Sequence, residues 1–222
     1  MIKQMLIVYC MLVPVPSWAM IVRQYPIVTD TYIDSQSPTS NFGSSGSVKV
    51  VVNGDDGSLT RGLYSLPADI WLIPAEDVIS VKIWFWTFMN NTGDRTVLLH
   101  PLTGPFSEGG ATWNSADGVN PWLTPGGDYD TATSVQAVEG TNWFSWDISG
   151  LWNNANLRSF GAMLKMNDES NPGAGNMPRA PFNSSDNSAA ELPYVEVTYV
   201  PEPAAMVLIG CMGWVVFIRR RF

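Results

Sequence analysis

The chain has 222 residues and is acidic, with 12 basic and 20 acidic residues and a formal net charge of −8. Residues 20–200 hold eight of the basic and nineteen of the acidic residues, so this interior carries −11. That charge excludes the basic surface that nucleic-acid binding requires, and it disfavours polyuronate ligands unless divalent cations bridge the charges. The length of the interior predicts one globular domain with its own core.

The amino terminus has the three parts of a secretory signal peptide. Lys3 supplies a positive charge, residues 5–15 are apolar, and Ser17 and Ala19 are the small residues that signal peptidase reads. We therefore predict a signal peptide over residues 1–19, cleaved by signal peptidase after Ala19. The chain is expected to be exported.

Cysteine usage agrees with this processing. The chain contains two cysteines, Cys10 in the predicted signal peptide and Cys211 near the carboxyl end, in a second segment expected to be removed. The mature domain would then have no thiol for a disulfide, a metal ligand or a nucleophile. Its stability outside the cell must come from packing.

Residues 20–199 consist of short apolar runs separated by Gly, Pro, Asn, Asp and Ser, with no sustained helical period. In the last run, Val195 and Val197 fall on one face while Glu196 and Thr198 fall on the other, as in a half-buried strand. This pattern predicts an all-β domain, an antiparallel two-sheet sandwich arranged as a jelly roll. The strands are predicted at residues 31–33, 48–52, 62–65, 79–88, 97–99, 143–148, 161–166 and 194–200, with a short helical turn at 151–157 and an irregular crossing at 67–74.

Four blocks of this region form a recognisable series: DTYID at 30–34 followed by NFG at 41–43, RGLYSLP at 61–67, FSEGGATWN at 106–114, and FNSSD at 182–186. Read in this order, they resemble DNRLRE-type domains, which are extracellular jelly-roll modules related to a family of carbohydrate-binding modules. The last block departs from the family, because Ser185 and Asp186 stand where an arginine and a glutamate are usual. The resemblance implies the fold more specifically than it implies a ligand.

These blocks also have a direct physical reading. Residues 41–43 combine an asparagine, an aromatic anchor and a glycine, which is turn chemistry. Thr112, Trp113 and Asn114 place a large ring between two groups that can bond backbone atoms, so they predict a corner that pins a long loop to the sandwich. Glu108 has two alternatives: it bonds the backbone of that loop, or it pairs with Arg61.

Catalytic signals are weak. His100 is the only histidine, and no serine lies in a nucleophile-elbow pattern. A glycosidase needs two carboxylates at a defined separation, and Glu108 with Asp117, or Asp168 with Glu169, are unspecific candidates. We predict that the domain is not an enzyme, with a secreted polysaccharide-active glycosidase or lyase as the alternative.

Two loops rich in carboxylate and amide side chains are compatible with a metal site. Asp55 and Asp56 lie in an Asn/Gly-rich turn, and Asp128 and Asp130 follow two glycines. Hard cations use such oxygens, although these sequences are more often ordinary hairpin links. A structural calcium ion is therefore the one cofactor that we consider, without assigned ligands.

The tryptophans support a more specific functional hypothesis than the metal site, namely carbohydrate binding. Exposed indoles stack on the apolar C–H faces of sugar rings, while nearby amides and carboxylates bond the hydroxyls. The candidates are the four tryptophans expected near loops, whereas four others are expected in the core or on a sheet surface. The first set is Trp113, Trp122, Trp143 and Trp152, and the second is Trp71, Trp84, Trp86 and Trp146. In the strand 79–88, where Trp84 and Trp86 oppose Val81, Ile83 and Phe85, both faces are expected to be covered.

The carboxyl end, residues 200–222, is predicted to direct the location of the protein and not to form part of the folded domain. Pro201, Glu202 and Pro203 precede an uncharged run at 204–218, and Arg219, Arg220 and Arg221 follow it. As a helix the run spans about 22 Å, which is short for a bilayer core of about 30 Å, but snorkelling arginines and local thinning make up the difference. The arginines fix that end in the cytoplasm.

This order resembles the PEP-CTERM sorting signal of bacterial surface proteins, with a simple tail anchor as the alternative. The resemblance implies exosortase as a processing partner and a final location at the cell surface or in the extracellular matrix. Together the signals predict an exported, noncatalytic structural or adhesive module that is first anchored in the membrane. An extracellular polysaccharide is its expected ligand, and a subunit of an extracellular assembly is a third alternative.

Overall fold

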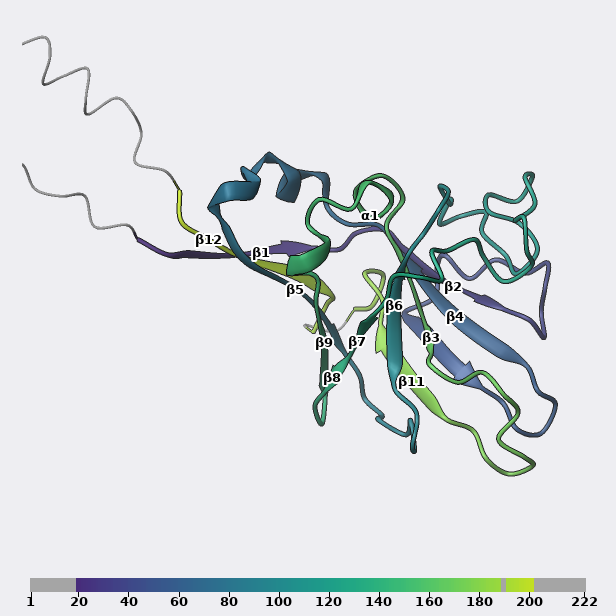
Figure 1. Ribbon diagram of the computed structural model, residues 1–222. Coiled ribbons are helices and arrows are strands. Elements are labelled where there is room, and N and C mark those ends of the chain that lie inside the picture. The colour runs from purple at the N-terminus through teal and green to yellow at the C-terminus, as the bar shows by residue number, and fades with distance from the viewer. Residues whose placement is uncertain (1–18, 189–190, 202–222) are drawn as a thin grey trace, which may run out of the picture.

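The computed structural model describes residues 19–188 and 191–201 (Figure 1). The predicted signal peptide up to residue 18 and the sorting signal from Glu202 onward lie outside the described residues. Ala19 and Pro201, the two ends of the described chain, are both exposed. None of the helices within the described ranges is long and apolar enough to cross a membrane.

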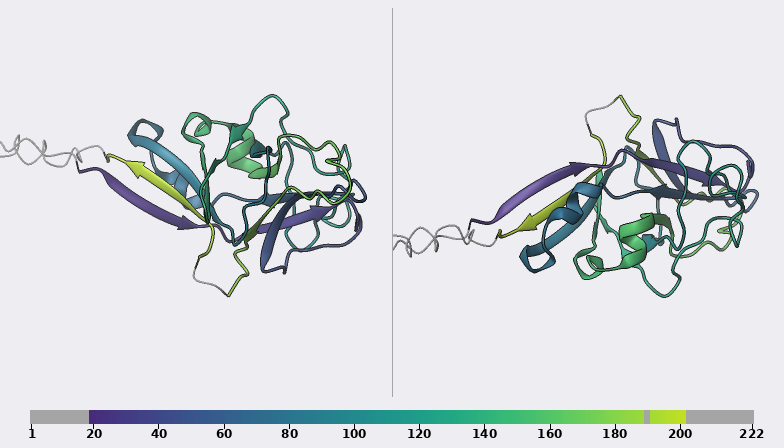
Figure 2. Two further views of the ribbon diagram at one scale, coloured as in Figure 1. Left: turned by 90° about the horizontal axis from the view of Figure 1, so that it is seen from below. Right: turned by 90° about the horizontal axis from the view of Figure 1, so that it is seen from above.

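One sheet, sheet A, contains five antiparallel strands in the order β1-β12-β5-β9-β8. The strands are β1 (Ile21–Pro26), β12 (Tyr194–Tyr199), β5 (Val78–Trp86), β9 (Trp143–Asp147) and β8 (Val138–Glu139). Because Ile21 pairs with Tyr199, the two ends of the described chain leave side by side. The β1–β12 ribbon extends toward the termini in all three views (Figures 1 and 2).

The other sheet, sheet B, contains seven strands in the order β11-β3-β4-β10-β6-β7, with β2 also paired to β4. All of its strand pairs are antiparallel. The strands are β11 (Arg179–Asn183), β3 (Ser47–Val52), β4 (Leu59–Tyr64), β10 (Ala162–Met166), β6 (Val97–Pro101), β7 (Val135–Gln136) and β2 (Asp30–Asp34).

The main core lies between the two sheets and follows strand alternation. On β5, Val81, Ile83 and Phe85 point inward and are fully buried. Phe85 meets Trp146 and Phe182 at centroid distances of 6.1 and 5.6 Å. Burying such rings contributes a large share of the hydrophobic stabilisation, as a domain without disulfides in its described residues requires.

A second, smaller core lies on the outer face of sheet B. Residues 102–134, here called the covering loop, join β6 to β7 and bring Leu102, Ala111 and Trp122 onto Leu63 and Met163 of the sheet. The covering loop therefore closes one outer face of the sandwich, and sheet A has no equivalent cover among the described segments.

The all-β prediction and all eight predicted strands are confirmed, but the sheet order does not establish a jelly roll. Two longer strands were missed, β1 and β11. The predicted crossing at 67–74 holds the 3₁₀ helix η1 (Ala68–Leu72), and η2 (Ala75–Asp77) follows it. The predicted helical turn corresponds to η3 (Ser149–Leu151) and α1 (Ala155–Phe160), which Asn154 caps by accepting a bond from the Leu157 amide.

Candidate functional site

The outer face of sheet A carries a group of aromatic side chains. Alternation on β5 places Trp84 and Trp86 outward, opposite the buried residues of that strand. Register then sets Tyr194 of β12 directly across from Trp84, and Trp143 of β9 directly across from Trp86. All four side chains are half-buried. We call these four residues the aromatic face.

Ring contacts join three members of the aromatic face. Trp84 lies 6.5 Å from Trp143 and 6.3 Å from Tyr194, and Trp143 and Tyr194 are 5.5 Å apart. Trp86 lies across from Trp143 in the strand register and meets Phe88 at a centroid distance of 6.5 Å, and Phe88 is 57% exposed. The Trp84 Nε1 group is buried and has no hydrogen-bond partner among the described residues. Such contacts hold the rings in place.

A row of polar side chains runs across the same face next to the rings. Cross-strand register aligns Gln24, Glu196, Lys82 and Asp147 on four adjacent strands. Gln24 Nε2 donates to Glu196 Oε2 at 3.5 Å. Burial and the nearby Glu196 charge raise the pKa of Tyr194, so its hydroxyl stays neutral at physiological pH. The face therefore combines apolar rings with donors and acceptors.

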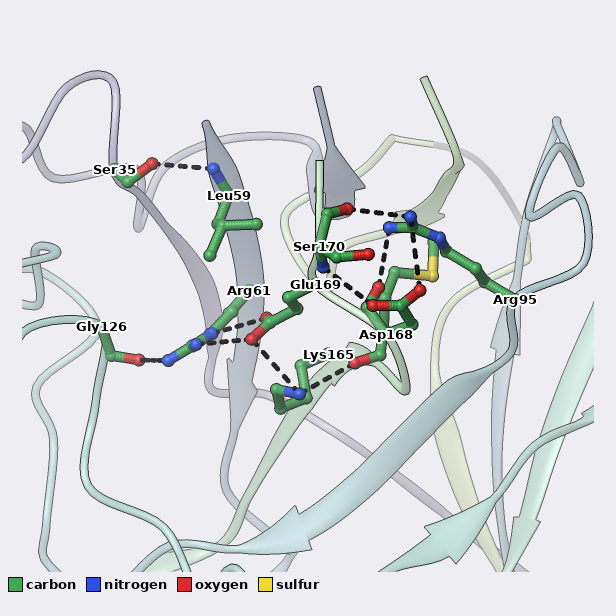
Figure 3. Close-up of polar contacts among 10 residues, drawn as sticks. Ser35, Leu59, Arg61, Arg95, Gly126, Lys165, Asp168, Glu169 and Ser170 are labelled. Atoms are coloured by element: carbon green, nitrogen blue, oxygen red, sulfur yellow. Dashed lines mark hydrogen bonds and ion pairs between the residues drawn. The ribbon is translucent and has the colours of Figure 1, made fainter. Parts of the chain in front are cut away.

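Sheet B presents different chemistry on its outer face. Arg61 of β4 donates through Nε and Nη2 to both carboxylate oxygens of Glu169, at 2.8 and 2.7 Å (Figure 3). Lys165 of β10 lies 3.3 Å from the same carboxylate and donates to the Met166 carbonyl at 2.8 Å. We call Arg61, Lys165 and Glu169 the ionic cluster. Its side chains are only 10–17% exposed, so its charges are largely removed from water.

Arg61 also holds the covering loop. Its Nη1 donates to the Gly126 carbonyl at 2.7 Å, and its guanidinium lies over the rings of Trp113 at 5.1 Å and Tyr129 at 5.6 Å. A hollow of about 340 Å³ beside it is lined by Arg61, Tyr129 and other residues of the loop. Because Arg61 is bonded to Glu169 and Gly126 and packed against two rings of the loop, we assign it a structural role.

The first resemblance block anchors the covering loop as well. Asn41 Nδ2 donates to the carbonyls of Glu108 and Ala111 at 2.7 and 2.8 Å. A Cβ on Gly43 would collide with the Glu108 carbonyl, so glycine is required there by close approach. The turn predicted from sequence is confirmed, since the Gly43 amide donates to Asn41 Oδ1 at 3.1 Å and the Ser45 amide donates to the Phe42 carbonyl at 3.0 Å, although the φ of Gly43 is not in the left-handed region. The predicted role in a structural corner is otherwise consistent with these contacts.

Candidate catalytic carboxylates are also engaged in internal bonds. Glu108 accepts from the Asp30 amide at 2.8 Å, so the alternative pairing with Arg61 is wrong. Asp117 caps its own turn by accepting from the Asn120 amide at 2.7 Å. Asp168 lies 3.5 Å from Arg95, and Glu169 belongs to the ionic cluster. Each of these carboxylates therefore has a local structural partner.

The divergent closing block has a clear local partner. Ser184 Oγ donates to Asp30 Oδ1 at 2.6 Å, and the Ser185 amide donates to Asp30 Oδ2 at 2.8 Å. Burial raises the pKa of Asp30, although these two bonds oppose that shift. The serines thus tie the segment before β12 to the start of β2.

The loops considered for calcium are closed by hydrogen bonds. Asp55 accepts from the Gly175 amide and Asp56 from the Ser58 amide, at 2.7 and 2.8 Å. Asp128 accepts from the Leu123 amide at 2.8 Å, and Asp130 accepts from the Ala132 amide at 2.9 Å. Within the described ranges no three His, Cys, Asp or Glu side chains gather as a metal site would need.

The four tryptophans proposed as sugar contacts have different environments. Trp122 and Trp152 are each 5% exposed, and Trp122 Nε1 donates to the Thr112 carbonyl. These two offer no free ring face in this conformation. Trp113 is half-buried against Arg61, and Trp143 belongs to the aromatic face. Its other members, Trp84, Trp86 and Tyr194, were missed because the strand that carries both tryptophans was expected to be covered on each side.

The domain is therefore an antiparallel two-sheet β-sandwich that presents half-buried aromatic rings and a polar row together on sheet A. Comparison with known protein families matches residues 22–199 to carbohydrate-binding module family 96. This match covers nearly the whole described domain, and the chain belongs to that family. No curated protein matches the chain.

Proposed function

We propose that the protein is an exported carbohydrate-binding module that holds polysaccharide on the aromatic face without cleaving it. The observation that carries the proposal is the half-exposed aromatic cluster beside a polar row on one uncovered sheet. Indole and phenol rings match the C–H faces of pyranoses, and the polar row matches their hydroxyls. Membership in carbohydrate-binding module family 96 supports the same ligand class.

A noncatalytic role fits the internal bonding of the carboxylates. Glu108, Asp117, Asp168 and Glu169 each stabilise a loop or a cation, and His100 Nδ1 lies within hydrogen-bond distance of two backbone carbonyls. A glycosidase would instead need a pair of carboxylates free to reach substrate. The aromatic face serves binding and orientation alone.

We further propose that the terminal sequences govern location. The signal peptide ending at Ala19 directs export, and residues 204–218 anchor the chain before exosortase cuts near Pro201, Glu202 and Pro203. The product then belongs to the cell surface or the extracellular matrix. This sequence of events is tested by comparing the termini and location of the protein in cells with and without exosortase.

The binding proposal is tested on the full chain in a detergent without a sugar headgroup, since such headgroups would compete. Affinity is measured against neutral and acidic polysaccharides, with calcium and then with a chelator, while released reducing ends and unsaturated products are assayed. We expect binding without release. Trp143→Ala should weaken binding, whereas Leu123→Ala, at a 93% exposed position on the covering loop, should not. Product release would support the enzyme alternative, and equal binding by both variants would exclude the aromatic face.

A further inference from the structure

Exposed apolar side chains gather at the end of the domain where the chain termini leave. Nine large hydrophobic residues are exposed in the described chain, and four of them lie on or immediately before β1, on η1 or at the start of β5. They are Met20 at 63%, Val22 at 53%, Leu72 at 82% and Ile79 at 54% exposed. We call these four residues the apolar tip. Single exposed hydrophobics are ordinary, so their grouping at one end is the informative feature.

Aromatic and polar groups of the interfacial type lie beside the apolar tip. A hollow of about 560 Å³ is lined by Leu72, Tyr25, Tyr199, Arg23 and Pro201, among others. The Arg23 guanidinium lies 6.0 Å from the Tyr25 ring centre. Tyrosine and arginine with apolar neighbours are typical of surfaces that meet a membrane interface, because each has an apolar body and a polar end.

The sequence beyond Pro201 limits how far this end can lie from a bilayer. Only Glu202 and Pro203 separate Pro201 from the uncharged run at 204–218. Even a fully extended chain spans at most about 10 Å from Pro201 to Ala204. If residues 204–218 enter a membrane, the apolar tip is therefore held within reach of the headgroup region.

We propose that the apolar tip contacts the lipid interface and seats the domain on the membrane while the chain is anchored. This inference rests on the anchoring proposed above. The tip favours uncharged headgroups, because Asp69, Glu76 and Asp77 outnumber Arg23 at this end. A bilayer contact also accounts for leaving Leu72 in the open on a short helix.

The test uses site-specific fluorophores in the full chain, in which the two native cysteines can be replaced by serine. One protein keeps Cys211 alone and reports on the anchor. A second carries Leu72→Cys, a third carries Ile79→Cys, and the control carries Leu123→Cys, since Leu123 is even more exposed on the covering loop. Each is reconstituted into phosphatidylcholine vesicles with and without lipid bearing a nitroxide near the headgroup.

We expect the labels at positions 72 and 79 to shift their emission to shorter wavelength and to lose intensity with the nitroxide lipid, while the label at 123 does neither. If the label at Cys211 is quenched while the labels at 72 and 79 show no more quenching or emission shift than the label at 123, the tip contact is overturned and the anchor stands. No lipid contact at Cys211 would overturn both. Addition of the anionic lipid phosphatidylglycerol should reduce quenching of the label at position 72. An increase in that quenching would contradict the preference for uncharged headgroups.

Discussion

The two outer faces of the sandwich use similar residue types for different purposes. On sheet A, rings and charges remain partly open, with Trp143 and Tyr194 above the strands and Lys82 aligned with Glu196. On sheet B, the covering loop closes over the surface, and Arg61 is held by a carboxylate, a carbonyl and two rings. A tryptophan or an arginine therefore indicates binding only where the fold leaves it uncovered.

The largest effect should follow from breaking the ionic cluster. Glu169→Gln leaves Arg61 and Lys165 without their shared negative partner in a largely buried setting, so the free energy of unfolding should fall by about 3 kcal/mol. Urea unfolding measures the loss. Asp168→Asn is the matched control, because its side chain is 54% exposed and its pair with Arg95 is 3.5 Å long; it should cost at most about 1 kcal/mol. If both variants lost the same free energy of unfolding, the buried ionic cluster would be no more important for stability than the exposed pair of Asp168 and Arg95.

On sheet A the corresponding change should alter affinity more than stability. Tyr194→Ala removes a ring from the aromatic face, and polysaccharide binding should weaken roughly tenfold, or about 1.4 kcal/mol. Tyr194→Phe keeps the ring and separates stacking from the contribution of the hydroxyl, so it should lose much less. Calorimetric titration with a bound polysaccharide checks both variants. If Glu169→Gln weakened binding by the folded protein as much, the division of roles between the faces would be wrong.

A smaller effect is expected at the start of β2, beside the covering loop. Burial raises the pKa of Asp30 above its ordinary value of 3.8, and burial also raises the pKa of nearby Glu108. The folded protein then holds these protons to higher pH than the unfolded chain, so stability falls as pH rises from about 3.8 through the folded pKa values. Thermal unfolding across this range should show that slope. Asp30→Asn should flatten it in part, and an unchanged slope would contradict the assignment to Asp30.

The smallest effect concerns His100, also on the sheet B side. Burial, followed by the charge of Lys165, lowers the pKa of His100 below 6.5, while the Asp130 and Thr133 carbonyls oppose this shift. The unfolded chain then takes up a proton first, so stability falls as pH decreases from about 6.5 toward the folded pKa. Unfolding measured between pH 5 and 8 should show this decline. His100→Gln should remove it, and persistence of the decline would assign it to another group.

Local pattern predicted most of the fold. Alternation in β5 and β12 is visible in the sequence because each strand has one face in the main core. β11 was missed because Pro181 interrupts the pattern, yet the strand lies at the edge of sheet B, where a proline is tolerated. β1 was missed because all six of its residues are exposed or half-buried, so no apolar period marks it.

The candidate site was less predictable, because burial depends on contacts between distant segments. Assigning tryptophans by their nearness to loops failed at Trp122, since the covering loop folds onto its own small core. The partner of Arg61 is 108 residues away, at Glu169, and nothing in the local sequence distinguishes that carboxylate from Glu108. Trp84 and Trp86 could have been recognised only by knowing that none of the described segments covers the outer face of sheet A.

Strand β12 has a mechanical consequence. It lies between β1 and β5, with Tyr194 of the aromatic face at one end and the exit toward Pro201 at the other. Tension between a glycan held on that face and an anchored carboxyl end would run along this strand. Because Trp84 and Trp143 hold the glycan from β5 and β9, the hydrogen bonds between β12 and β5 would then be loaded in shear. They would have to break together, which resists force far better than opening them one at a time.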